Sequence, residues 1–215
     1  MSFEVMISQL TIHFGKSFLI FILTLFFSMP LGWVIYFGRK SRFKPLSWLV
    51  KVYISIMRGT PLMLQLIIWY FGPYYLWEMN IGGYKFTAII LGFAFNYAAY
   101  FAEIYRSGIE SMPVGQYEAA QLLGYNKYQT FLKIILPQVI KRVLPSITNE
   151  VITLVKDTSL AYSVSYTEMF AIAKQIAAAE TTIIPLVAAG VFYYIFNAIV
   201  AWAMEFIEKK LNYYR

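Results

Sequence analysis

The chain has 215 residues, of which 60% are hydrophobic and only 13% are charged, and its formal net charge is +7. Soluble domains are about 45–50% apolar and about 25% charged, so this composition excludes an ordinary soluble domain and a disordered chain. With no cysteine and one histidine, His13, the chain also lacks the residues for a disulfide scaffold, a Cys-ligated metal site or a paired-histidine motif.

An all-α integral membrane protein remains, and long apolar segments identify its spans. A membrane-spanning helix needs about 20 apolar residues. We predict one transmembrane domain over residues 1–215, with five spans in chain order: 17–37, 59–77, 85–105, 143–166 and 181–205. The fourth contains three charged residues, Glu150, Lys156 and Asp157. It is assigned as a span because the topology requires one.

The basic residues set the expected orientation. Six of them follow the first span without an intervening acid: Arg39, Lys40, Arg42, Lys44, Lys51 and Arg58. Because cytoplasmic loops carry the excess of Lys and Arg, this loop should lie inside, which places the N-terminus outside and the C-terminus inside. The rule also accounts for the positive charge without a nucleic-acid partner. No cleavable signal peptide is expected.

The segment 110–125 is too polar to span and should form a cytoplasmic helix between the third and fourth spans. It contains Glu118-Ala119-Ala120, then Gly124 after three residues, then Ile134-x-Leu136-Pro137 after nine more. Gly124 should permit the turn that ends this helix. Glu118 should cap its own helix or pair with a base on a partner, and Pro137 and Pro145 should break the path back to the membrane.

This pattern resembles the EAA motif of the permease subunits of type I ABC importers. Three further segments resemble the polar amino acid uptake branch of that family: 58–62, 100–109 and 155–160. The resemblance implies a multi-pass subunit of the bacterial plasma membrane that pairs with a second permease, a copy or a relative. It also implies a dimer of ATPase subunits docked at the coupling residues Glu118, Ala119, Ala120 and Gly124, and an extracytoplasmic binding protein that delivers polar amino acids.

Polar residues within the predicted spans are candidates for the substrate path. Asp157 is the strongest, because a carboxylate at membrane depth faces a cavity or a counter-charge; the alternative is a structural pair with Arg or Lys of another helix. Thr158 and Ser159 add donors and acceptors beside it. Glu150 is a second lining carboxylate, or a partner of Arg142 or Arg58. Asn96 lines the path or makes an interhelical hydrogen bond.

Two features of the third span have structural interpretations. Ala94, Ala98 and Ala102 lie four residues apart, a small-residue face that favours close packing against another helix of the chain. Glu103 and Arg106 are spaced for a local ion pair.

The sequence does not predict catalysis. It has no GxxxxGK[ST] motif to hold ATP phosphates, so no catalytic residue, metal or cofactor is expected in this chain, and ATP and Mg²⁺ should bind the partner. An ion-coupled secondary transporter that uses Asp157 and Glu150 is the alternative function, and a membrane enzyme is disfavoured because no acid/base or metal set is apparent.

Overall fold

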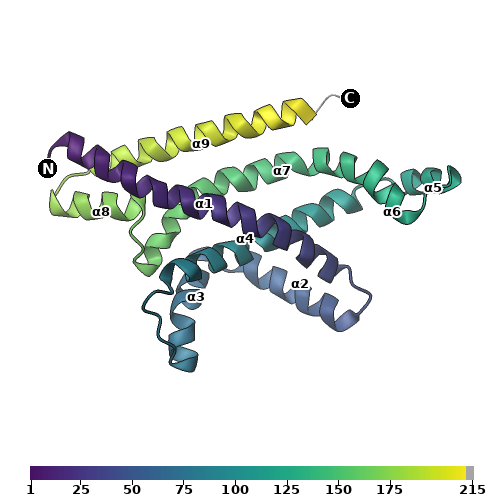
Figure 1. The fold of residues 1–215 in the computed structure, drawn as a ribbon, viewed down its shortest axis with the longest axis horizontal. Helices are drawn as coiled ribbons and strands as arrows, with labels where there is room; N and C mark the ends of the chain where they lie inside the picture. Colours follow the sequence, from purple (N-terminus) through teal and green to yellow (C-terminus); the bar gives the residue numbers. More distant parts are fainter. Residues whose placement is uncertain (212–215) are drawn as a thin grey trace.

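The computed structural model describes residues 1–211, in which helices are joined by short connections and no strand is present (Figure 1). Its elements, in chain order, are α1 (Phe3–Arg39), α2 (Lys44–Gly59), α3 (Leu62–Trp77), α4 (Lys85–Glu110), α5 (Val114–Leu122), α6 (Lys127–Gln129), the π-helical η1 (Thr130–Ile135), α7 (Leu136–Asp157), the 3-10 helix η2 (Thr158–Val164), α8 (Met169–Ala179) and α9 (Ile184–Leu211).

The centre of the fold is the pair α1 and α4, which make the most extensive helix contact. Small residues allow the close approach. Thr24, Ser28 and Gly32 of α1 are buried, and a Cβ on Gly32 would lie only 2.8 Å from Cβ of Phe101. Ala94, Ala98 and Ala102 of α4 are also buried within the chain, so the predicted intramolecular packing of this face is confirmed.

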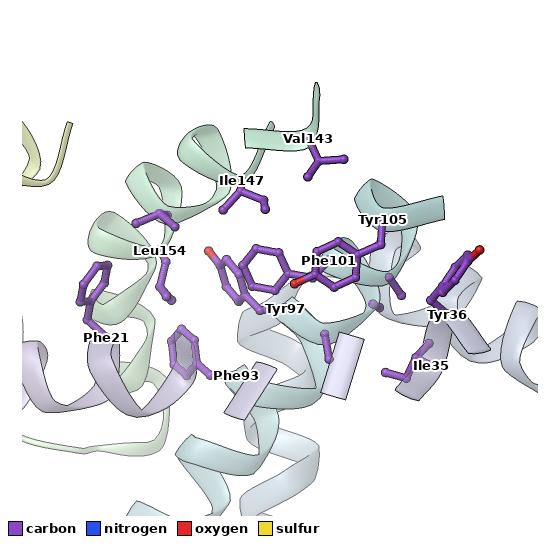
Figure 2. Close-up of a cluster of buried hydrophobic side chains, with 14 of the residues drawn as sticks. Phe21, Ile35, Tyr36, Phe93, Tyr97, Phe101, Tyr105, Val143, Ile147 and Leu154 are labelled. Carbon is purple, nitrogen blue, oxygen red and sulfur yellow. The ribbon is translucent and has the colours of Figure 1, made fainter. Parts of the chain in front are cut away.

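A ladder of aromatic residues on α4 fills the space between α1 and α7 (Figure 2). Phe93, Tyr97, Phe101 and Tyr105 recur at every fourth position and are all at most 3% exposed. Residues of α1 and α7 pack against them, among them Phe21, Ile35, Val143, Ile147 and Leu154. Because α-helical residues four apart share a face, this spacing turns one side of α4 into a continuous core.

Helices α2 and α3 meet at a bend of 112°. Pro61 causes it, because the residue before a proline is driven out of the helical region, and Thr60 is extended at φ −122° and ψ 149°. The break leaves the last carbonyls of α2 without helical partners. The Gln65 side-chain amide donates to the carbonyl oxygens of Met57 at 3.0 Å and of the C-cap residue Thr60 at 3.2 Å, which satisfies two carbonyls at the break.

The predicted break at Pro137 and Pro145 is wrong. The chain is helical without interruption from Lys127 to Asp157. The π-helical turn of η1 directly precedes Leu136 and Pro137, and this wider register removes the need for the hydrogen bond that proline cannot donate. Pro145 lies inside α7, which continues past it for three further turns.

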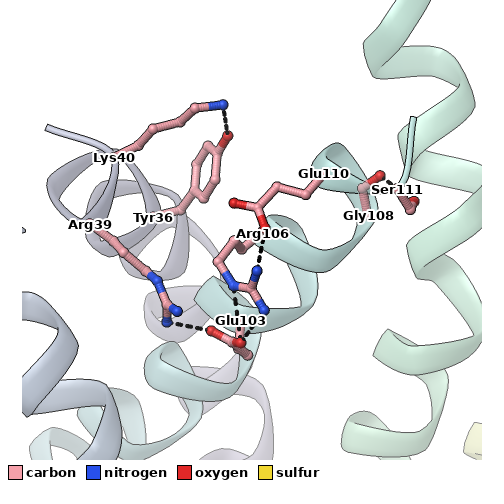
Figure 3. A network of polar contacts seen from close by, with 8 residues as sticks. All are labelled: Tyr36, Arg39, Lys40, Glu103, Arg106, Gly108, Glu110 and Ser111. Carbon is pink, nitrogen blue, oxygen red and sulfur yellow. Dashed lines mark hydrogen bonds and ion pairs between the residues drawn. The ribbon is translucent and has the colours of Figure 1, made fainter. Parts of the chain in front are cut away.

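A network of charged residues ties the end of α1 to α4 (Figure 3). Glu103 accepts from Arg39 at 2.6 Å and from Arg106 at 2.5 Å, and Arg106 also pairs with Glu110. The predicted Glu103–Arg106 pair is therefore confirmed. It belongs to a larger network that fixes the register of two long helices.

The length and hydropathy of each helix indicate which of them could cross a membrane. Three helices, α1, α4 and α9, are long and apolar enough to cross a membrane, and the bent pair of α2 and α3 adds a fourth candidate. In Figure 1, α1, α4 and α9 run in one direction and α2 and α7 in the other, while the N-terminus and the end of α9 lie toward opposite ends. This arrangement is compatible with an odd number of crossings, and the five-span orientation stays a prediction.

Gly108 offers a test of the packing between α4 and α7. A Cβ there would lie 2.1 Å from Cγ1 of Val143, and overpacking of this kind costs about 1–3 kcal/mol. We expect Gly108→Ala to lower the melting temperature of the purified protein and Val143→Ala in the same chain to restore part of it. Gly115→Ala is the matched control, because nothing lies within 4 Å of its added Cβ. A wild-type melting temperature for Gly108→Ala would contradict this packing.

Candidate functional site: a coupling helix and a polar path

The segment with the EAA pattern forms a short helix of its own, α5, at one end of the molecule (Figure 1). Pro113 immediately precedes the first residue of α5. At the other end, Leu123 is the C-cap, and Gly124 comes next with φ +80°. The amides of Gly124 and Tyr125 donate to the carbonyls of Gln121 and Ala120, each at 3.0 Å. This is a glycine-terminated helix end, so the predicted role of Gly124 in the turn is confirmed.

Two leucines at the end of α5, its last residue Leu122 and its C-cap Leu123, have almost no cover in the described chain. Leu122 is 90% exposed and Leu123 is 76% exposed, whereas Ala120 is 1% exposed and faces inward. Ala119 and Glu118 are exposed as well. The Glu118 carboxylate makes no hydrogen bond or ion pair within residues 1–211 and does not cap α5, so the self-capping alternative is wrong.

Side-chain contacts fasten α5 to the long helices. Gln116 and Gln138 of α7 exchange two amide hydrogen bonds of 2.9 and 2.8 Å. Tyr117 packs against the hydrophobic core that contains the aromatic ladder of α4. Just before α5, the carbonyl of Ser111 accepts from Arg142 of α7 at 2.6 Å. These contacts connect α5 to α7 and to the end of α4.

The predicted path residues fall into separate environments. Asp157 is the last residue of α7 and is half-buried. Its Oδ2 accepts from the Tyr97 hydroxyl at 2.7 Å. No Lys or Arg within the described chain forms an ion pair with it, and the adjacent Lys156 is exposed. The alternative, a structural pair with Arg or Lys of another helix, is therefore not seen in the described chain, where Tyr97 is the partner and the other carboxylate oxygen has no hydrogen bond.

Thr158 and Ser159 begin η2 directly after Asp157. The Thr158 and Ser159 hydroxyls donate to the carbonyls of Val155 and Lys156, each at 2.8 Å. Thr158 is fully buried and Ser159 is only partly so. Both hydroxyls therefore tighten the end of α7, and only the partly exposed Ser159 keeps an oxygen that a ligand can reach as an acceptor.

Asn96 lies on α4 and faces the bend between α2 and α3. It is 4% exposed, and its amide donates to the Met57 carbonyl and to Oε1 of Gln65, both at 3.0 Å. These contacts match the interhelical hydrogen bond that the sequence left open. They also explain how a broken helix is held against α4.

Glu150 lines an open, polar cavity of about 300 Å³ between α2, α4 and α7. Arg58 and Arg142 line it too, but neither forms an ion pair with Glu150 within residues 1–211. The structure thus places Glu150 in a cavity and does not show the predicted pair. No group of three or more His, Asp or Glu residues that could hold a metal is found in this part of the chain.

Sequence analysis missed Glu168, a fully buried carboxylate at the start of α8. It accepts from the amides of Phe170 and Ala171 and from the hydroxyls of Ser17 and Tyr193. The usual N-cap residues are Ser, Thr, Asp and Asn, and Glu is not among them, so no standard sequence signal marks this cap. Through its hydrogen bonds, Glu168 joins α1, α8 and α9.

Comparison with known proteins assigns the chain to a family. The model of the family described as binding-protein-dependent transport system inner membrane component matches residues 28–213. The L-cystine transport system permease protein TcyB of Bacillus subtilis (strain 168) is 35% identical over 90% of this chain and 82% of its own length. The arginine transport system permease protein ArtQ of the same strain is 37% identical over 85% of this chain and 83% of its own length.

Solved structures agree with this assignment. A crystal structure of an amino acid ABC transporter with histidines superposes with a TM-score of 0.87 at 27% identity and covers 98% of this chain and 99% of that one. The MetNI methionine ABC transporter in an inward-facing conformation shares the fold at a TM-score of 0.71 and 18% identity, over 99% and 100% of the two chains. The chain therefore belongs to the binding-protein-dependent transport system inner membrane components, the permease subunits of ABC transporters.

Proposed function

We propose that this permease forms the translocation path of an ATP-driven importer of polar amino acids in the bacterial plasma membrane. The observation that carries the proposal is α5, which belongs to an intact EAA pattern, is hydrogen-bonded to α7, and ends in two uncovered leucines, Leu122 and its C-cap Leu123. An exposed apolar patch of this kind marks a protein interaction site. Relatives named for cystine and arginine transport support an amino acid as the cargo.

The partners follow from this role. A dimer of ATPase subunits docks at Glu118, Ala119, Ala120 and Gly124 and supplies the ATP and Mg²⁺ chemistry. A second permease subunit completes the channel, and an extracytoplasmic binding protein delivers the substrate. Under the five-span orientation, α5 and the end of α9 face the cytoplasm, which agrees with the concentration of basic residues from the end of α1 through α2.

The path through the subunit passes Asp157, where the free carboxylate oxygen binds the ammonium group of the substrate. The partly exposed Ser159 supplies an acceptor oxygen beside it, and the fully buried Thr158 holds the end of α7 that carries Asp157. Glu150 is the next carboxylate inward along α7. Asn96 contributes to the path by holding the bend of α2 and α3 in place.

Reconstitution tests this function against the ion-coupled alternative. The permease, its ATPase and its binding protein are placed in proteoliposomes, and uptake of labelled glutamine, cystine, arginine and histidine is measured with internal ATP or with an imposed ion gradient. We expect uptake of at least one of them with ATP alone. Uptake that needs a gradient and proceeds without the ATPase would overturn the proposal.

A further inference from the structure

The polar cavity between α2, α4 and α7 holds an unusual set of charged groups. Its charged lining residues are Arg58, Glu103, Arg106, Arg142 and Glu150. Its volume of about 300 Å³ lies at the lower end of the range of small-molecule sites, about 300–1,000 Å³. The partners of each group decide what the cavity can bind.

Two of the five groups are already neutralised. Glu103 accepts from Arg39 at 2.6 Å and from Arg106 at 2.5 Å, and Arg106 pairs with Glu110 as well (Figure 3). Their charges cancel within this network. They form one wall of the cavity and are not available to a ligand.

Arg142 is held in a fixed orientation at the edge of the cavity. Its Nη1 donates to the Ser111 carbonyl at 2.6 Å and to the Ser111 hydroxyl at 2.9 Å. Both acceptors are neutral, so its positive charge is not cancelled. The cavity therefore retains a cationic edge next to the start of α5.

Arg58 and Glu150 are the two groups without a hydrogen bond or ion pair inside residues 1–211. Arg58 lies in the last turn of α2 and is exposed, and its Cζ lies 5.3 Å from the ring centroid of Tyr100. Glu150 is half-buried on α7. One guanidinium and one carboxylate thus line the same cavity with their hydrogen-bonding groups free.

We infer that Arg58 and Glu150 form a second, inner station for the substrate that recognises the backbone of an α-amino acid. The Arg58 guanidinium binds the α-carboxylate through a bidentate pair, and Glu150 binds the α-ammonium group. The two guanidinium groups that no carboxylate neutralises, Arg58 and Arg142, set the side of the cavity on which the α-carboxylate lies. Because this pair contacts only the backbone, the station accepts polar amino acids with different side chains.

The inference rests on the proposed function and adds a step to it. Glu150 precedes Asp157 by two helical turns, about 10 Å along α7, on the side toward α5. A substrate released from Asp157 meets the Arg58–Glu150 pair before it leaves at that end. Asp157 has no cation paired with it and so cannot by itself select for the carboxylate.

Binding to the purified permease–ATPase complex, without the binding protein, tests the station. Labelled glutamine, cystine, arginine and histidine are measured in turn, and the tightest ligand is compared with its α-carboxamide, which lacks the carboxylate charge. We expect Arg58→Gln to weaken binding of the amino acid about 10- to 150-fold, the range for a lost charge-assisted hydrogen bond. We also expect it to abolish the preference over the α-carboxamide.

Three variants make the result specific. Arg58→Lys keeps the charge but loses the bidentate geometry, and it should bind with intermediate affinity. Glu150→Gln should weaken binding yet keep the preference for the carboxylate. Arg42→Gln removes the same charge from an exposed site between α1 and α2 and should bind as wild type does.

Other results would overturn the inference. An Arg58→Gln variant with wild-type affinity and preference, or the absence of binding by all four amino acids to the wild-type complex, would contradict it. If Asp157→Asn still impairs ATP-driven uptake in that case, the proposed function stands and only the inner station fails. If neither variant affects affinity or uptake, both assignments fail.

Discussion

Replacing Gly124 by valine should weaken the association of the permease with its ATPase about 5- to 30-fold and reduce uptake, without changing membrane insertion. Gly124 has φ +80°, and a β-branched side chain in that region costs about 1–2 kcal/mol. The end of α5 will then leave its present conformation for part of the time. Apparent affinity falls with the population of the competent state, so the cost appears as weaker docking. Pull-down of the ATPase and a melting curve of the permease measure the two effects.

The matched control is Gly124→Asn. Asparagine tolerates the left-handed region, and no atom lies within 4 Å of a Cβ at this position, so neither strain nor a clash should disturb α5. We expect near-normal association for asparagine. Equal retention of the ATPase by wild type and the valine variant would refute the role of α5. Equal loss in the valine and asparagine variants would show that any side chain at 124 blocks the partner.

Asp157→Asn should weaken substrate binding in the permease about 10- to 150-fold and leave folding intact. The loss is that of a charge-assisted hydrogen bond to the ammonium group, about 1.5–3 kcal/mol. Folding should survive because Asp157 pairs with no Lys or Arg in the described chain and the amide oxygen still accepts from Tyr97. Had Asp157 neutralised a buried base, its loss would have cost about 3–5 kcal/mol of stability.

Uptake kinetics and melting temperature separate the two roles of Asp157. A raised KM at a normal melting temperature supports the substrate role, and a low melting temperature with poor yield supports a structural one. Lys156→Gln is the control, because it removes a neighbouring charge from an exposed side chain and should transport normally. Wild-type uptake by Asp157→Asn would remove Asp157 from the path.

The sequence was most informative where local rules act. The apolar runs located α1, α4 and α9, and the EAA spacing located α5 and its terminal glycine. The alanine face of α4 and the Glu103–Arg106 pair also follow from helical spacing alone, because residues three or four apart meet on one face. These features need no knowledge of distant contacts.

Features that depend on distant partners were not predictable. Tyr97 meets Asp157 across 60 positions, and Asn96 meets the α2–α3 bend across 39 positions. No periodicity encodes such pairs. The predicted break at Pro137 is wrong for a different reason. Proline disrupts a regular α-helix, but here the π-helical turn of η1 directly precedes it and the helix continues.

Accessibility of Leu122 tests most directly whether α5 is a cytoplasmic coupling helix. The chain has no cysteine, so Leu122→Cys introduces a single reactive thiol at a position that is 90% exposed. A maleimide that does not cross membranes is applied to intact cells and to inside-out vesicles, with and without the ATPase. We expect the thiol at position 122 to be labelled in inside-out vesicles only, and to be protected from the maleimide when the ATPase is bound. Labelling from outside intact cells would contradict both the five-span orientation and the coupling role.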